Sequence, residues 1–216
     1  KETYPEYIPC VLLQMTLVAF SDIIQIAREW NSDGLLKSFV LSNIHGLSPN
    51  FINGVKTVDY EETKQLYLHI LDAYEKHQDW VVLKIFLDEC LAYWKDRPII
   101  DAGQSVPMAT CMPINSKIYI DSQMQIGICE KVADKYRIGN VKNGIDWKRA
   151  NEIVEEYYHK RVERCKYCPA IRMCDMCLTA VEYSDEQWDI LCHNERVYAQ
   201  IFMFLYCEMA ERGLIK

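Results

Sequence analysis

Several features are scarce in this sequence, and each shortage excludes a class of protein. Only eight of the 216 residues are glycine, whereas secreted disulfide scaffolds are usually short and rich in loops. No apolar run approaches the roughly 20 residues of a membrane-spanning helix. The chain also lacks the excess of positive charge that nucleic-acid-binding proteins usually carry, since its formal net charge is −7. We therefore expect neither a membrane nor nucleic acid as a partner.

Cysteine, in contrast, is abundant. Half of the residues are apolar and a quarter are charged, which is typical of a globular protein that builds a core without disulfides. A reducing cytoplasm is therefore the expected location, and clustered cysteines there indicate metal ligands. The ten cysteines occupy positions 10, 90, 111, 129, 165, 168, 174, 177, 192 and 207.

The first hundred residues predict alternating strands and helices. Residues 8–17 and 36–44 are nearly continuous apolar runs, typical of strands buried on both faces. Amphipathic segments that predict helices lie at residues 23–30, 59–77 and 80–94. This order is typical of a parallel α/β sheet or barrel. Because two strands cannot complete a barrel, we expect residues 1–102 to be the C-terminal half of a partial barrel.

From residue 111 onward the predicted elements are shorter. They are strands at 117–121 and 125–129 with a hairpin turn between them, and helices at 146–161, 184–191 and 194–213. Ser184 with Gln187 forms a capping box, and Asn194 can cap the last helix, which we expect to pack on the cysteine-rich region. The charges around Lys160, Arg161 and Arg164 indicate a solvated helix face.

Seven cysteines have the spacing of metal ligands. Four of them, from Cys165 to Cys177, lie within thirteen residues in the pattern Cys-x2-Cys-x5-Cys-x2-Cys, and Cys192 follows after fourteen more. Upstream, Cys111 and Cys129 are separated by seventeen residues. Each corner iron of a cubane iron–sulfur cluster takes one thiolate, so closely spaced cysteines on a loop can reach several corners. Nearby cations balance the added negative charge, and Lys166 and Arg172 are placed for this.

Zinc is the alternative metal. Two Cys-x2-Cys pairs could form one tetrahedral four-cysteine site. The pairs are, however, closer together than in the usual zinc ribbon, and zinc leaves Cys111, Cys129 and Cys192 unexplained. We therefore favour iron–sulfur clusters and keep zinc as a substitute. The remaining cysteines occur singly, as buried structural thiols do; they are Cys10, Cys90 and Cys207.

The residues around these cysteines resemble a known family. The first stretch reads Cys111-Met-Pro-Ile-Asn-Ser-Lys-Ile-Tyr-Ile-Asp121, and the later run reads Cys165-Lys-Tyr-Cys-Pro-Ala-Ile-Arg-Met-Cys-Asp-Met-Cys177. Over about residues 108–195, the chain resembles the SPASM domain, the C-terminal auxiliary-cluster module of many radical SAM enzymes. The resemblance is specific, because seven cysteines agree in order and approximate spacing.

The resemblance implies a ligand set for two auxiliary [4Fe–4S] clusters. The implied ligands of the outer cluster are Cys165, Cys168, Cys174 and Cys192. The implied ligands of the inner cluster are Cys111, Cys129 and Cys177. The fourth ligand of the inner cluster is not identified. Cys10 or Cys90 could supply it, or one iron could instead bind a substrate thiol.

Two positions depart from the family pattern. The family usually has a glycine where this chain has Met124, so we expect the hairpin turn to differ. The spacing from Cys174 to Cys177 is two residues, one fewer than the family pattern. Neither departure removes a ligand.

The strand–helix–strand region resembles, more loosely, the last part of a radical SAM partial barrel. The combination looks most like maturases that modify ribosomally synthesised peptides, including those that form thioether crosslinks. The resemblance implies a parent enzyme that cleaves S-adenosylmethionine, with Met15 and Asn43 near the adenosyl moiety. It implies a precursor peptide and the rest of the radical SAM core as partners.

The Cys-x3-Cys-x2-Cys loop of that chemistry is missing from these 216 residues, so they are not expected to be catalytic alone. The chain starts at Lys1 without Met, and we expect a fragment of a longer enzyme. The alternatives are a non-catalytic pseudo-maturase that recognises a peptide and a zinc-stabilised interaction domain. The expected α/β organisation is a partial barrel at 1–102, a small α+β SPASM-like module at 103–195 and a C-terminal helix at 196–216.

Overall fold

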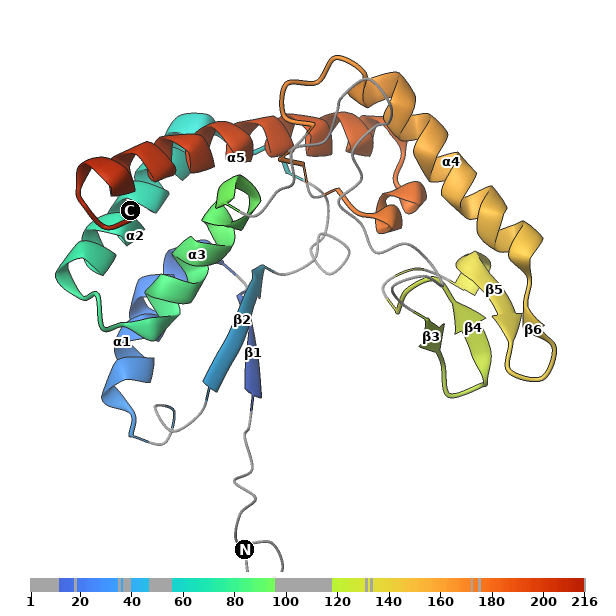
Figure 1. The fold of residues 1–216 in the computed structure, drawn as a ribbon, viewed down its shortest axis with the longest axis horizontal. Helices are drawn as coiled ribbons and strands as arrows, with labels where there is room; N and C mark the ends of the chain where they lie inside the picture. Colours follow the sequence, from blue (N-terminus) through green and yellow to red (C-terminus); the bar gives the residue numbers. More distant parts are fainter. Residues whose placement is uncertain are drawn as a thin grey trace, which may run out of the picture. The chain divides into compact units, whose positions relative to one another are not determined.

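The computed structural model describes residues 12–17, 19–34, 36, 40–46, 56–95, 118–130, 132, 134–171, 173–174 and 176–215. The chain divides into two compact units. The first consists of Lys1–Arg97 with Gln200–Lys216, and the second of Pro98–Ala199. Each unit contains its own small sheet (Figure 1).

A parallel strand pair lies in the first unit. Strand β1 (Leu12–Leu17) pairs in parallel with β2 (Val40–Gly46). The chain between them forms the 3-10 turn η1 (Phe20–Asp22) and helix α1 (Ile23–Ser32). The predicted order of strand, helix and strand is therefore confirmed. The described strands form this pair and one antiparallel sheet, not a barrel.

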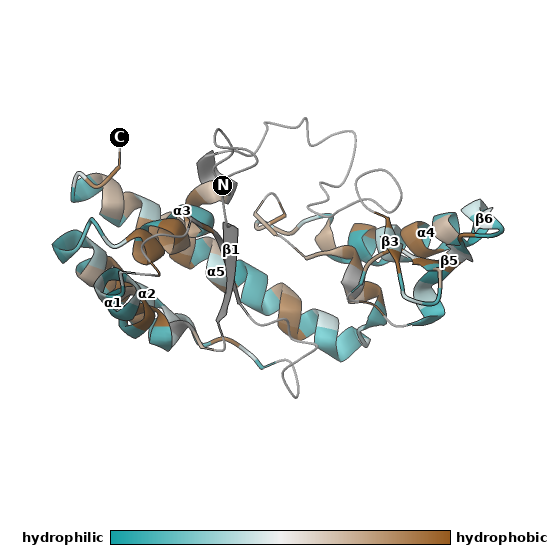
Figure 2. Ribbon diagram, turned by 90° about the horizontal axis from the view of Figure 1, so that it is seen from below, coloured by the Kyte–Doolittle hydropathy of each residue, from teal (hydrophilic) through white to brown (hydrophobic). Residues whose placement is uncertain are grey.

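Three helices supply the hydrophobic core of the first unit. Helix α2 (Tyr60–Lys76) begins after Asp59, whose carboxylate accepts the N–H of Glu62 at 2.8 Å, as the capping pattern predicts. Helix α3 (Val81–Lys95) packs against α1, α2 and β2, and Figure 2 shows its apolar residues in brown. The buried side chains of this core include Ile23, Trp30, Ile70, Leu71, Leu83, Leu87 and Leu91.

Helix α5 (Asp185–Glu211) is one continuous helix where the sequence predicts two. The predicted capping box at its start is confirmed: the Ser184 N–H donates to Gln187 Oε1 at 2.9 Å, and the Gln187 N–H donates to Ser184 Oγ at 3.3 Å. The predicted break before Asn194 is wrong, because Asn194 is buried inside the helix. No glycine or proline interrupts residues 185–211.

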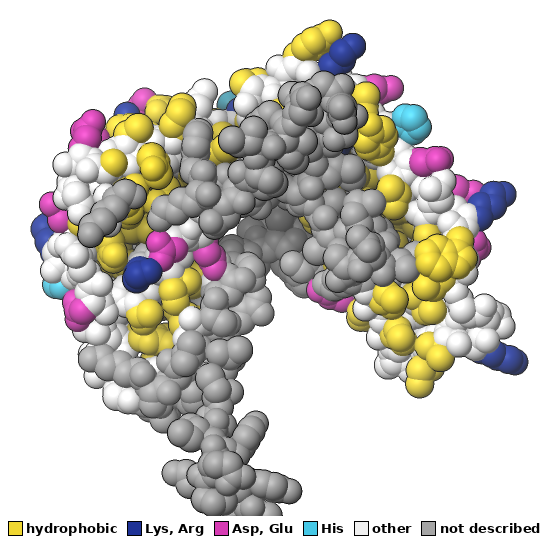
Figure 3. Space-filling view, in the orientation of Figure 1, with side chains coloured by type: hydrophobic (Ala, Val, Ile, Leu, Met, Phe, Trp, Pro, Cys, Tyr) yellow, Lys and Arg dark blue, Asp and Glu magenta, His cyan; other side chains and the backbone are white. Residues whose placement is uncertain are grey.

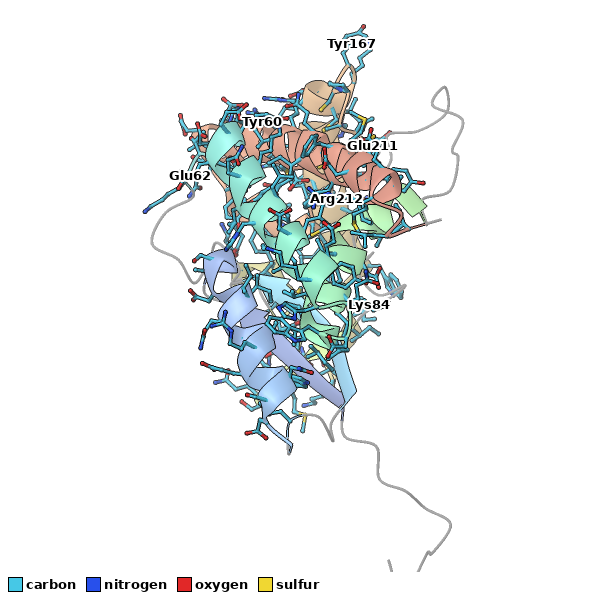
Figure 4. All side chains as sticks on the ribbon, turned by 90° about the vertical axis from the view of Figure 1, so that its left-hand side faces the viewer. Tyr60, Glu62, Lys84, Tyr167, Glu211 and Arg212 are labelled. Carbon is cyan, nitrogen blue, oxygen red and sulfur yellow. The ribbon has the colours of Figure 1, made fainter. Side chains whose placement is uncertain are left out.

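The C-terminal part of α5 packs on α2 in the first unit, which corrects the expectation that it packs on the cysteine-rich region. The Phe202 ring meets the Tyr67 ring edge-on, with centroids 5.6 Å apart. Beyond the helix end, Arg212 donates to Asp72 at 2.7 Å and to Glu75 at 2.9 Å (Figure 4). No helix in the described residues combines the length and apolarity needed to cross a membrane.

The second unit contains a four-stranded antiparallel sheet in the order β3-β4-β5-β6. Its strands are β3 (Tyr119–Ile120), β4 (Gln125–Gly127), β5 (Arg137–Asn140) and β6 (Gly144–Ile145), with the 3-10 turn η4 (Asp134–Tyr136) before β5. Helix α4 (Trp147–Cys165) follows, and Asp146 caps it by accepting the Arg149 N–H at 3.0 Å. The 3-10 turn η5 (Leu178–Glu182) precedes α5.

The core of the second unit lies between this sheet, α4, η5 and the start of α5. Trp188 is fully buried, and its indole N–H donates to the Ala180 carbonyl at 2.9 Å. The other large buried side chains of this cluster are Ile126, Ile128, Tyr136, Ile138, Ile153 and Tyr157. Exposed hydrophobic side chains also surround the sheet (Figure 3); they are Ile118, Ile120, Met124, Val141 and Trp147.

The predicted hairpin between β3 and β4 is confirmed, and Asp121 organises its turn. One Asp121 oxygen accepts the N–H groups of Gln123 at 2.8 Å and Gln125 at 2.9 Å, as in an Asx turn. The other oxygen lies 2.8 Å from an Arg137 nitrogen. Met124 has a φ of 60°, in the left-handed region that favours glycine. The turn therefore places a left-handed residue at Met124 although this residue carries a Cβ atom.

Replacing Met124 with glycine should raise the free energy of unfolding by about 0.5–1 kcal/mol, because glycine adopts a positive φ without a Cβ clash. Urea denaturation followed by circular dichroism measures the change. The matched control is Gln123→Gly in the same turn, where a glycine adds unfolded-state entropy without relieving strain and should lower stability. A lower midpoint for Met124→Gly than for the unchanged chain would contradict the strain at this position.

Candidate metal site

Six of the seven predicted ligands lie in the described residues, and all belong to the second unit. Cys129 follows β4, Cys165 ends α4, and Cys192 lies in α5. Cys168, Cys174 and Cys177 lie between α4 and η5. The cysteines described as free thiols are Cys90, Cys129, Cys165, Cys168, Cys174, Cys177, Cys192 and Cys207. Cys111 and Cys10 lie outside the described residues.

Three predicted ligands of the outer cluster are close enough to influence one another electrostatically. Burial raises the pKa of the Cys165 thiol, Arg161 opposes this rise, and Cys168 adds to it. Burial also raises the pKa of the Cys192 thiol, and Cys165 and Cys168 raise it further. These three thiols come from the end of α4, the following turn and α5.

Tight turns carry the chain from α4 past these thiols. The Cys168 N–H donates to the Cys165 carbonyl at 3.0 Å, and the Cys174 N–H donates to the Ala170 carbonyl at 2.9 Å. Tyr167, between the first two cysteines, is 87% exposed and points away from the ribbon (Figure 4). Cys174 is instead part of the buried core, and Cys192 packs against the same core. The turns thus place successive cysteines at different depths.

A buried guanidinium lies beneath this segment. Arg161 is 0% exposed, and its Nη1 donates to the Tyr157 hydroxyl and the Met176 carbonyl, both at 3.1 Å. The same nitrogen lies 3.9 Å from Cys174 Sγ. Tyr157 also donates its hydroxyl to the Met176 carbonyl, and burial raises the pKa of this hydroxyl. Two side chains of α4 therefore hold the backbone between Cys174 and Cys177.

Arg161 is the buried residue beside the predicted ligands that sequence reasoning missed. Its interpretation as part of a solvated helix face is wrong. Buried residues of α4 recur at positions 150, 153, 157, 161 and 165, which is the three-to-four-residue spacing of one helix face. Position 161 falls on that apolar stripe, and this periodicity could have identified it.

In residue type, the cysteines and the nearby guanidinium suit a thiolate-bound metal group. A buried cation is stabilised by an adjacent anion, and thiols become anions when they bind a metal. No three His, Cys, Asp or Glu side chains in the described residues lie close enough to hold one metal ion.

The predicted inner ligands Cys129 and Cys177 lie beside different partners. Cys129 Sγ is 3.4 Å from Glu130 Oε2 and lines a pocket of about 130 Å³, together with Tyr119, Tyr136 and Arg137. Cys177 lies instead near Tyr183: burial raises the pKa of the Tyr183 hydroxyl, and Cys177 raises it further. Among the described residues, neither predicted set forms a group that could hold a metal ion.

The candidate binding residues of the first unit that the structure describes lie in its strands and in α3. Met15 in β1 pairs with Ile44, and Asn43 in β2 pairs with Gln14, so the two predicted positions lie on neighbouring strands. Their side chains lie outside the described part. Cys90 is buried in α3. Burial raises the pKa of its thiol to about 12, while a hydrogen bond with Tyr67 opposes the rise.

Cys90 should react with iodoacetamide at least 100-fold more slowly than Cys207 at pH 8. A thiol with a pKa of about 12 is thiolate in about one molecule in ten thousand at that pH, whereas Cys207 lies exposed on α5. Mass spectrometry of the metal-free chain measures both rates, and a urea-unfolded sample shows that Cys90 can react. Comparable labelling of the two thiols in the folded chain would contradict the burial of Cys90.

No protein-family model, curated protein or solved structure matches this chain.

Proposed function

We propose that this chain is the auxiliary-cluster part of a radical SAM enzyme that modifies a ribosomally synthesised peptide, as in thioether crosslinking. In this proposal the outer [4Fe–4S] cluster is held by the set Cys165, Cys168, Cys174 and Cys192. The inner [4Fe–4S] cluster is held by Cys111, Cys129 and Cys177. The observation that supports the proposal is the position of the buried Arg161 guanidinium, 3.9 Å from Cys174 Sγ and on the helix face that also carries Cys165.

The position of Cys192 favours this ligand set over a zinc site made of two Cys-x2-Cys pairs. Cys192 interacts electrostatically with Cys165 and Cys168 although it belongs to α5. A four-cysteine zinc site within residues 165–177 does not need Cys192. The outer set of the SPASM resemblance, in contrast, includes it as the final ligand.

In the parent enzyme, the residues of this chain would bind the auxiliary clusters and orient the peptide substrate. When bound, an iron–sulfur cluster supplies electron transfer or a Lewis-acidic iron. In this proposal, a peptide side chain would enter the pocket beside Cys129, one of the inner ligands. Because the chain has no Cys-x3-Cys-x2-Cys loop, cleavage of S-adenosylmethionine belongs to the rest of the radical SAM core. A cytoplasmic location suits these oxygen-sensitive ligands.

The second candidate is a zinc-stabilised interaction domain, and two cysteine variants separate it from the proposal. After anaerobic reconstitution, we expect about eight irons and eight sulfides per chain, since two [4Fe–4S] clusters bind. Cys192→Ser should reduce both to about four, because it removes one outer ligand. Elemental analysis and electron paramagnetic resonance after reduction measure this outcome.

The control is Cys207→Ser, which changes an exposed thiol on the same helix and should leave the iron content unchanged. A content of about one zinc per chain without sulfide would overturn the proposal. In that case Cys177→Ser should abolish zinc binding and Cys192→Ser should not, because one four-cysteine site satisfies zinc.

A further inference from the structure

We propose that Arg161 is the counter-cation of the outer cysteine set, and that the charge of its guanidinium determines how tightly this set binds metal. The inference rests on the thiol site of the proposed function. It assigns a role to a side chain that is neither a ligand nor a neighbour of a ligand in sequence.

The position of Arg161 on α4 makes its charge costly unless an anion lies nearby. The side chain is 0% exposed, on the same helix face as Ile153 and Tyr157, which are also fully buried. A buried cation without water is strongly unfavourable unless it is paired and hydrogen-bonded. Arginine stays protonated in such places, so the charge cannot be avoided by deprotonation.

The hydrogen bonds of Arg161 orient the guanidinium toward the thiols. The Nη1 atom donates to two uncharged acceptors among the described residues, the Tyr157 hydroxyl and the Met176 carbonyl. The same nitrogen faces Cys174 Sγ at 3.9 Å. Cys165 lies one helical turn farther along the same face of α4 and also interacts with the guanidinium. One cation thus faces two predicted ligands from different segments.

Metal binding changes the charge at these two thiols. Each ligating cysteine loses its proton and becomes a thiolate, so negative charge develops next to a guanidinium that is already in place. The attraction is strong because the site is buried. Arg164 also acts on Cys165 but is held at the surface by Asp185 and Asp189. Of the two described cations that act on Cys165, Arg161 is therefore the buried one.

The test measures Zn²⁺ and Co²⁺ affinity of the full metal-free chain by competition with a chromophoric chelator. Arg161→Met keeps much of the side-chain volume and removes the charge, and it should weaken metal binding by about 10- to 100-fold, as expected for a residue that supports ligands. Arg161→Lys retains a cation and should bind metal more tightly than Arg161→Met. Circular dichroism and the urea midpoint of each metal-free variant show that it folds.

Two further variants separate charge from positioning. Tyr157→Phe removes the second hydrogen bond to the Met176 carbonyl without changing the charge, and its affinity should stay closer to that of the unchanged chain. Lys160→Met removes one positive charge from the same helix and should leave the affinity unchanged, because position 160 lies outside the buried stripe. Equal losses in Arg161→Met and Arg161→Lys, or in Arg161→Met and Tyr157→Phe, would overturn the role of charge.

The same samples distinguish this inference from the proposed function. If the unchanged chain binds zinc but assembles no iron–sulfur cluster, and Arg161→Met binds zinc more weakly, the inference stands and the proposed function fails. If clusters assemble and the zinc affinity of Arg161→Met equals that of the unchanged chain, the inference fails and the proposed function stands.

Discussion

Among the described residues of the second unit, one charged side chain is fully buried in the core, and the cysteine segment is held through it. Arg161 lies at 0% exposure on a helix face that otherwise carries apolar side chains, and the surrounding structure accommodates its guanidinium. Tyr157 and Arg161 both bond to the Met176 carbonyl, which anchors the backbone between two predicted ligands. Trp188 closes the same core by bonding to η5. The polar side chains of this core, Tyr157 and Arg161, thus also hold the backbone between Cys174 and Cys177.

The two units are stabilised by different physical means. The first unit has a core of aliphatic and aromatic side chains from α1, α2 and α3, and the end of α5 is fastened to α2 by the ion pairs of Arg212. The second unit buries thiols and a guanidinium among its hydrophobic side chains. Burial of groups that can be charged costs free energy.

Local sequence signals predicted many of the elements and failed at particular residues. The caps at Asp59, Asp146 and Ser184 mark the starts of α2, α4 and α5, because each depends on hydrogen bonds within three residues. The hairpin at Asp121 is similarly local. The predicted break before Asn194 was wrong, because a cap-forming residue type also fits inside a helix when tertiary contacts bury it. Met124 shows the same limit, since the turn around Asp121 imposes a conformation that methionine alone disfavours.

The sequence by itself determined the chemistry available to this protein: seven spaced thiols, a strand–helix–strand segment and the turns and caps that begin its helices. These features follow from residue types over short distances, where backbone hydrogen bonds and side-chain spacing decide the outcome. Only the tertiary structure decided which thiols the core takes up and which cation lies beside them. Cys192 packs against the core from α5, and Arg161 is buried beside Cys174 and the Met176 carbonyl, which lie beyond α4. Burial and charge pairing depend on neighbours that are distant in the chain, and therefore arise only when the core has formed.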